Sequence, residues 1–393
     1  MPHYLVLRNV SAAKTSSPFE SFGAGAAEAP APGPPEPRVE LHDISTQEAS
    51  SLARDDEVAA VAIPMPVTLI KPLEVEAGAA ATSAWGIPAV KADTSSFTGD
   101  GIVAAVLDSG IDSTHPAFAG VTLIEQDFTG SGNGDQNSHG THCAGTIFGR
   151  DVDGTRIGIA RGVKKALIGK VLDGAGRGSS EMIFRGIQWA LDQGAHVISM
   201  SIGFDFPGAV KRAEDSGLPT QPAVSNALES YRSNLRFFDA LMQMVKAQAA
   251  FRETAVVVAA AGNESNRPAF TIAASLPAAA DGVISVAALG RAADNKFQIA
   301  NFSNTMAQIA APGVDILSAK IGGGLSNKSG TSMACPHVAG LSILWWEALK
   351  KSGMVRPTAS LVTSNLLTKA RTDVLASGMT MNDRGTGIAT APQ

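Results

Sequence analysis

The chain has 393 residues, of which 45% are hydrophobic and 17% are charged, and its formal net charge is -5 at pH 7. A chain of this length and apolar content can bury a large core and still leave residues for a small second module. The weak negative charge offers no basic face for nucleic acid, and no apolar run in the sequence approaches the length of a membrane span. These values argue against a nucleic-acid binder and a membrane-spanning protein, and they favour a globular α/β enzyme.

Residues 1–80 differ in character from the rest of the chain. The first eight lack the charged and then apolar profile of a secretory signal, so we expect a cytoplasmic location, with a secreted protein whose signal has been removed as the alternative. A strand is predicted at 4–10. The stretch at 29–35 alternates Ala, Pro and Gly, and its prolines cannot continue a helix or a central strand, so it is predicted to be a loop or linker. The alternating pattern at 39–44 predicts a second strand.

A short helix and an extended segment complete this amino-terminal region. Ser45 and Glu48 have the spacing of a capping box, which predicts that a helix begins there. The extended segment at 58–70 contains Pro64 and Pro66, which should confine it to the edge of a sheet. We therefore predict a small module of strands and one helix.

Three separated runs carry the residues of a serine nucleophile and its partners. The apolar run at 102–107 predicts a buried parallel strand that carries Asp108 at its carboxyl end. Small residues around His139 would let a helix begin close beneath the site. A serine hydroxyl such as that of Ser332 becomes nucleophilic when a histidine takes its proton and a carboxylate orients that histidine. Ala334 lies where the G-x-S-x-G elbow of lipases and esterases needs Gly, which argues against that class.

Other chemistries are less well supported by the same residues. His139 and His142 could form a metal pair, but no further Cys or His stands at the spacing of a zinc site. The glycine run at 174–178 lacks the Lys-Ser/Thr pair of a phosphate-binding loop. Cys143 and Cys335 fall close after His139 and the proposed nucleophile, so we expect free, packed thiols on the two helices.

The order Asp108, His139, Ser332, together with the residues around each, resembles the subtilisin-like serine peptidase family over about residues 83–350. The resemblance implies a doubly wound parallel sheet flanked by helices, and hydrolysis of peptide bonds through an acyl-enzyme on Ser332. It also implies that Asn263, after a buried strand, completes the oxyanion hole.

The resemblance further implies where a polypeptide substrate lies. An extended peptide would add as a strand between two edges built of small residues, next to a pocket with small walls. A roomy pocket of this kind predicts a large apolar residue before the scissile bond. Arg177 could attract an acidic group further upstream or lie in solvent. The substrate-binding residues implied by the resemblance are Gly176, Arg177, Gly178, Ser201, Ile202, Gly203, Ala260, Ala261 and Gly262.

Residues 1–80 resemble the inhibitory prodomain of the same family, although the Pro-rich stretch replaces much of its first half. The implied partner is the chain itself, with the module acting as an intramolecular inhibitor that is removed by cleavage between Lys71 and Ser83. The alternative is a permanent accessory domain. Residues 81–393 would then form the peptidase domain.

The peptidase domain contains an insertion at about 204–252, longer than the family's core needs. Six apolar residues recur within it at steps of three and four, which predicts one amphipathic helix that packs on the core, or alternatively serves as a lid or dimer contact. The part at 204–222 contains Gly and Pro and is predicted to be a surface loop. The stripe consists of Leu228, Tyr231, Leu235, Phe238, Met242 and Val245.

No cofactor is expected. The loop at 149–154 carries two carboxylates that might bind a structural calcium ion, but a solvated turn explains them equally well, so we assign no metal ligand. Two rival functions remain open at this stage. An amine could capture the acyl-enzyme, which would make a transpeptidase or macrocyclase, or the chain could be a catalytically silent peptide-binding protein.

Overall fold

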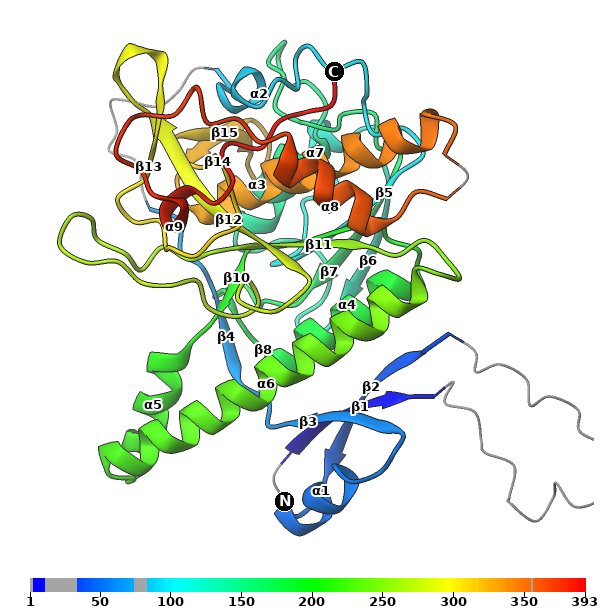
Figure 1. The fold of residues 1–393 in the computed structure, drawn as a ribbon, viewed down its shortest axis with the longest axis vertical. Coiled ribbons are helices and arrows are strands. Elements are labelled where there is room, and N and C mark those ends of the chain that lie inside the picture. Colours follow the sequence, from blue (N-terminus) through cyan, green and yellow to red (C-terminus); the bar gives the residue numbers. More distant parts are fainter. Residues whose placement is uncertain (1–2, 11–33, 74–82, 355) are drawn as a thin grey trace, which may run out of the picture.

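The computed structural model describes residues 3–10, 34–73, 83–354 and 356–393. A mostly parallel sheet lies at the centre of its larger part (Figure 1), with strand order β13-β12-β11-β9-β5-β7-β6 and with β14 paired to β12. Only the pairing of β12 with β13 is antiparallel. The strands are β5 (Val103–Asp108), β6 (Thr122–Asp127), β7 (Lys165–Lys170), β9 (Val197–Met200), β11 (Val256–Ala260), β12 (Val283–Arg291), β13 (Phe297–Ile299) and β14 (Ile309–Pro312).

Side chains of the central strands alternate between two buried apolar clusters, one on each face of the sheet. In β5, Ala104 and Val106 join the first cluster, whereas Ala105 and Leu107 join the second. A strand covered on both faces must be apolar at every position, which explains the uninterrupted run before Asp108. The doubly wound α/β fold predicted from the sequence is therefore confirmed. Helices α3 (His139–Phe148), α7 (Thr331–Lys351) and α8 (Ala359–Thr368) contribute to the first cluster, and α4 (Ser180–Asp192) and α6 (Thr220–Gln248) to the second.

Shorter elements surround this core. A two-stranded antiparallel pair is formed by β15 (Ile316–Ala319) and β16 (Leu325–Lys328). Single turns of helix are α2 (Gly86–Ala89), α9 (Met381–Arg384) and the 3-10 segments Pro116–Phe118 and Ala293–Asn295. Within the described ranges, no helix combines the length and apolarity required to cross a membrane. The cytoplasmic location stays a prediction.

The amino-terminal region folds as predicted into a small α+β module. Its antiparallel sheet has the order β2-β1-β3, from β1 (His3–Asn9), β2 (Pro37–Asp43) and β3 (Val58–Ala62), and α1 (Thr46–Leu52) has the expected capping box. Leu5 and Leu7 of β1 are fully buried and join the cluster that contains α4 and α6. The module therefore packs on the two helices of the second face (Figure 1). Most of the predicted loop at 29–35 lies outside the described residues.

The insertion is a helical hairpin, which corrects one prediction. The stripe from Leu228 to Val245 does lie on one long helix, α6. The predicted surface loop at 204–222, however, contains α5 (Phe206–Asp215). Asp205 caps this helix by accepting a hydrogen bond from the Gly208 N–H, and its proline lies in the first turn, where the missing N–H costs nothing. The prolines and glycines that suggested a loop therefore mark the start of a helix.

The extended segment at 58–70 contains two strands, and the second contradicts the edge prediction. Strand β4 (Pro66–Leu69) is the central strand of the sheet β10-β4-β8, between β8 (Arg177–Ser179) and β10 (Ile202–Phe204). Pro66 is tolerated there because it is the first residue of the strand. The two edges predicted to bind substrate, at 176–178 and 201–203, are here called the rails. Strand β4 of the chain's own amino-terminal segment pairs with both of them.

Candidate active site

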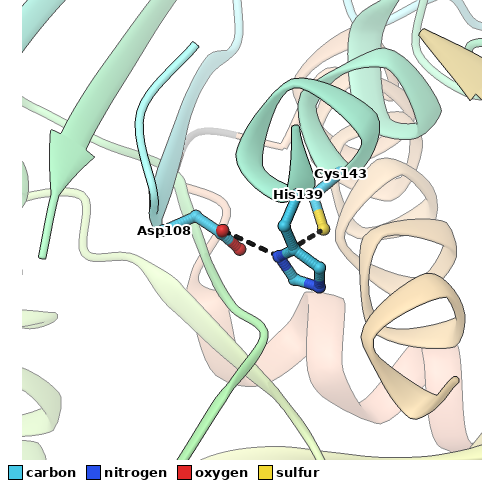
Figure 2. A group of neighbouring side chains, drawn as sticks. All are labelled: Asp108, His139 and Cys143. Carbon is cyan, nitrogen blue, oxygen red and sulfur yellow. Dashed lines mark hydrogen bonds and ion pairs between the residues drawn. The ribbon is translucent and has the colours of Figure 1, made fainter. Parts of the chain in front are cut away.

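Asp108 and His139 form the first part of the site (Figure 2). Asp108 ends β5 and His139 begins α3, and their side chains are 1% and 0% exposed. Asp108 Oδ1 lies 2.8 Å from His139 Nδ1 and also accepts a hydrogen bond from the Ser109 N–H. A carboxylate can only accept here, so Nδ1 carries the proton and Nε2 is the basic nitrogen. That Nε2 has no hydrogen-bond partner among the described residues.

The loop before α3 is organised by Asp135, a residue that the sequence analysis did not identify. Its Oδ1 accepts hydrogen bonds from Ser109 Oγ and from the N–H groups of 137 and 138, and its Oδ2 accepts from the N–H and hydroxyl of Thr141. Five donors on one carboxylate fix the loop that delivers His139. A Cβ on Gly140 would come within 2.2 Å of the Gly110 carbonyl oxygen, so the helix start can lie this close to β5 only with glycine.

Ser332 is the second residue of α7 and is fully buried. Its hydroxyl lies 3.1 Å from the carbonyl oxygen of Ile70 and 3.4 Å from that of Ser201. The hydroxyl of Ser201 in turn donates to the Ser332 carbonyl oxygen at 3.1 Å, which anchors the start of the helix to the β9–β10 connection. The nucleophile candidate is therefore turned toward the amino-terminal segment.

Asn263 follows β11, as the sequence predicted, and its amide is oriented by Thr331. Its Oδ1 accepts hydrogen bonds from the Thr331 N–H at 2.8 Å and from the Thr331 hydroxyl at 2.9 Å. With the oxygen held in this way, Nδ2 faces the cleft and donates to the Lys71 carbonyl oxygen at 3.0 Å. An amide donor at a peptide carbonyl is the arrangement that stabilises a developing oxyanion. Thr331 was not assigned a role from the sequence, although it directly precedes Ser332.

Strand β4 pairs antiparallel with both predicted rails. Val67 faces Gly178, Leu69 faces Ile202, and the Leu69 N–H donates to the Gly176 carbonyl at 2.8 Å. A Cβ on Gly178 would lie 2.2 Å from the Val171 carbonyl oxygen, so only glycine fits at that position of the rail. The rails predicted from the sequence therefore hold an extended peptide by its backbone.

Ile70 follows β4 and occupies the position of the predicted pocket. It is 5% exposed and belongs to the same buried cluster as Ala260 and Ala261. A Cβ on Gly203 would lie 3.2 Å from Ile70 Cγ1, so this glycine forms a wall against the side chain. Gly262 donates its N–H to the Thr331 hydroxyl, and the position of a Cβ on it faces Asn304 and Glu264 rather than Ile70. Arg177 is exposed and forms an ion pair with Asp173 at 3.4 Å.

The buried histidines and thiols nearby are held neutral. Burial lowers the pKa of His142 to about 3, and its Nε2 lies within hydrogen-bond distance of the carbonyl oxygens of 316 and 326. Burial likewise lowers the pKa of His337 to about 4. Burial also raises the pKa of Cys335 to about 11 and that of Cys143 well above its ordinary value. Both cysteines are free and lie on α7 and α3, as predicted.

Asp108, His139 and Cys143 are the one group in the described ranges whose ligand atoms lie close enough together, within 4.8 Å, to hold a metal ion (Figure 2). A metal would need a thiolate and a free imidazole nitrogen, but the Cys143 thiol is held protonated and His139 Nδ1 is bonded to Asp108. The contacts among the three side chains explain why their ligand atoms lie together, and we assign no metal ligand among them. In the loop at 149–154, Asp151 forms an ion pair with Arg161, and a calcium ion in this loop stays a prediction.

Comparison with known proteins agrees with this geometry. The model of the subtilase family matches residues 99–388. A relative named "Subtilisin-like protease 6", from Trichophyton verrucosum (strain HKI 0517), is 33% identical over 243 residues, which is 62% of this chain and 51% of that protein. "Subtilisin-like protease 3" of Pseudogymnoascus destructans is 33% identical over 273 residues, 67% of this chain and 56% of that protein. The chain thus spans about half the length of the curated relatives it matches.

Proposed function

The chain belongs to the subtilase family, and we propose that it is a serine endopeptidase that hydrolyses peptide bonds through an acyl-enzyme on Ser332. The observation that carries the proposal is an extended peptide bound between β8 and β10 with a carbonyl oxygen 3.1 Å from the Ser332 hydroxyl. The Asp108–His139 pair, with its basic Nε2 unpartnered within the described residues, supports it. The natural substrate is a polypeptide in this proposal.

The proposal assigns each step of the reaction to a residue of the site. The Ser332 hydroxyl turns from the Ile70 oxygen toward His139 and attacks the peptide carbonyl carbon as Nε2 takes its proton. Asp108 holds the resulting imidazolium through Nδ1. Asn263 Nδ2 and the Ser332 backbone N–H would donate to the tetrahedral oxyanion. His139 then gives its proton to the leaving amine, and water attacks the acyl-enzyme by the same route to release the acid.

We further propose that the amino-terminal module inhibits the enzyme and is removed by its own catalytic site. Two adjacent bonds lie at that site, because Ser332 contacts the Ile70 oxygen whereas Asn263 contacts the Lys71 oxygen. The buried side chain of Ile70, beside Gly203, favours Ile70–Lys71 as the scissile bond. Lys71 is exposed, and the bond after it leads to a proline. The Ile70–Lys71 bond lies just before the range predicted from the sequence for the cleavage, between Lys71 and Ser83. Most of that range is outside the described residues.

The test is the intact mass of the purified chain before and after a serine-directed fluorophosphonate, with Ser332→Ala as the control. An adduct on the wild-type chain alone, and a mature chain that begins at Lys71, would support both proposals. A full-length chain without adduct calls for deletion of residues 1–70 and a second labelling. Failure to label that variant would refute the hydrolase and leave the silent peptide-binding protein. Ligated product masses in the presence of an added amine would instead identify a transpeptidase.

A further inference from the structure

The amino-terminal segment is held well upstream of the β8 and β10 rails. The Met65 N–H donates to Ser180 Oγ at 2.9 Å, and the Ser180 N–H donates back to the Met65 carbonyl at 2.8 Å. Asn234 Nδ2 donates to the Ile63 carbonyl oxygen at 2.8 Å. Counted back from Ile70, Met65 is the sixth residue and Ile63 the eighth. The bound stretch is therefore twice the length of β4.

The groups that make these contacts lie on two helices of the peptidase domain and are buried beneath the bound segment. Ser180 begins α4, Asn234 lies on α6, and both are fully buried. Asn234 Nδ2 also donates to the Ser230 carbonyl one turn earlier, which sets the direction of the amide. All the contacts described go to backbone atoms of the bound segment, so they do not depend on its sequence.

Side chains of the same segment alternate into the core. Met65 and Val67 are each 1% exposed and belong to the cluster that contains Phe184 and Phe238, whereas Ile63 is 39% exposed. Phe184 of α4 and Phe238 of α6 remain in the chain when residues 1–70 leave, so we expect an apolar surface at the Met65 position. Ser180 and Asn234 then lose their partners on the bound segment and face solvent.

We infer that the substrate cleft extends to the eighth residue before the scissile bond, with an apolar pocket for the sixth and with Asn234 as a residue that positions the backbone of the eighth. This inference rests on the proposed function, in that β4 occupies the cleft in the direction of a substrate. Because Asn234 lies on α6, the inserted hairpin lengthens the cleft. The substrates are extended segments of unfolded chains or long loops, with apolar residues at alternate positions upstream.

The test compares two quenched fluorescent peptides on the self-processed enzyme. One carries Val-Thr-Leu-Ile before the scissile bond, and the other carries Ile-Pro-Met-Pro-Val-Thr-Leu-Ile, with identical residues after it. Burial of a methionine side chain predicts a kcat/KM on the order of tenfold higher for the longer peptide. Replacing its methionine by aspartate should abolish that advantage. Equal kcat/KM for the two peptides would overturn the inference.

Variants distinguish a role in the cleft from a role in the fold. Asn234→Ala should reduce the advantage of the longer peptide about threefold to tenfold, and Ser180→Ala should act in the same direction. Ser233→Ala, on the same turn of α6 and with a hydroxyl that donates to the Ser230 carbonyl, is the matched control and should leave the ratio unchanged. A proportional loss on both peptides in Asn234→Ala would indicate a structural role and overturn the assignment.

The outcome remains interpretable if hydrolysis fails. A chain that neither processes itself nor cleaves either peptide would refute the proposed function alone. Its own segment then still occupies the cleft, and hydrogen exchange of the backbone at 63–70 in the full chain would decide the inference. Asn234→Ala and Ser180→Ala should raise the exchange rate of that segment several-fold, whereas Ser233→Ala should leave it unchanged. Unchanged exchange in Asn234→Ala and Ser180→Ala would overturn the inference.

Discussion

Replacing Gly203 by alanine should narrow the pocket that holds the residue before the scissile bond. The added Cβ would lie 3.2 Å from Ile70 Cγ1, closer than the ordinary contact of about 3.5 to 4 Å between carbon atoms. Overpacking of this kind costs about 1 to 3 kcal/mol, so a tenfold loss of kcat/KM is expected for a peptide with isoleucine at that position. Gly203 lies in β10 and shows no positive φ, so the backbone accepts alanine without strain.

The assay is a pair of peptides that differ only in isoleucine or alanine before the scissile bond. The alanine side chain has three fewer carbons than that of isoleucine, and each buried carbon contributes about 0.8 kcal/mol. In the wild-type enzyme, kcat/KM should therefore be roughly 50-fold higher for the isoleucine peptide. Gly203→Ala should reduce that ratio to roughly 5. An unchanged ratio, or strict selection for a basic or acidic residue by the wild type, would refute the placement of the pocket. An equal loss on both peptides would indicate damage to the sheet.

Other predictions address the groups around the pocket. Asn263→Ala should lower kcat about 100-fold to 1000-fold with little change in KM, because the amide acts on the oxyanion; a change in KM alone would contradict this. Asp135→Asn places an amide against five donors and should lower both kcat and the melting temperature, whereas the exposed Asp151→Asn should change neither. Burial lowers the pKa of His142 to about 3 and of His337 to about 4, so both rings are neutral in the folded chain but gain a proton in the unfolded chain below about pH 6.5. The free energy of unfolding should therefore fall as the pH drops from about 6.5 to about 4, by roughly 1.4 kcal/mol per pH unit for each ring. Urea titrations of Ser332→Ala at pH 6.5 and pH 5 would measure the free energy of unfolding. A free energy that stays constant or rises as the pH drops would contradict the prediction.

The catalytic candidates were predictable because each stands at the end of a strongly patterned element. Asp108 ends and Asn263 follows an apolar run of the kind that favours a buried parallel strand, and the carboxyl ends of such strands meet at one edge of the sheet. His139 is the first residue of α3 and Ser332 the second of α7, and the first turns of both helices contain small residues. Local pattern and chain order were therefore enough to name these four residues as candidates.

The positioning residues were not predictable in the same way. Asp135 accepts hydrogen bonds from backbone N–H groups, and Thr331 donates to the amide oxygen of Asn263. Aspartate is common in loops and threonine is common at the start of a helix, so neither residue type draws attention in the sequence. The α5 helix was missed because a proline and a glycine near its start resemble a loop unless the capping aspartate before them is taken into account. The role of each of these residues depends on specific hydrogen bonds that the local sequence pattern does not show.

The central position of β4 in its sheet is the feature that was hardest to predict from the sequence. Its neighbours Gly178 and Ile202 are more than a hundred residues away in the sequence, and the prolines at 64 and 66 argued for an edge. Pairing on both sides was nevertheless allowed, because Pro66 stands at the first position and the later residues supply the N–H groups of the strand. The same pairing determines which carbonyl reaches Ser332. A shift of one residue would exchange the buried Ile70 for the exposed Lys71, so the cleavage site depends on the register of a strand that only the folded chain defines.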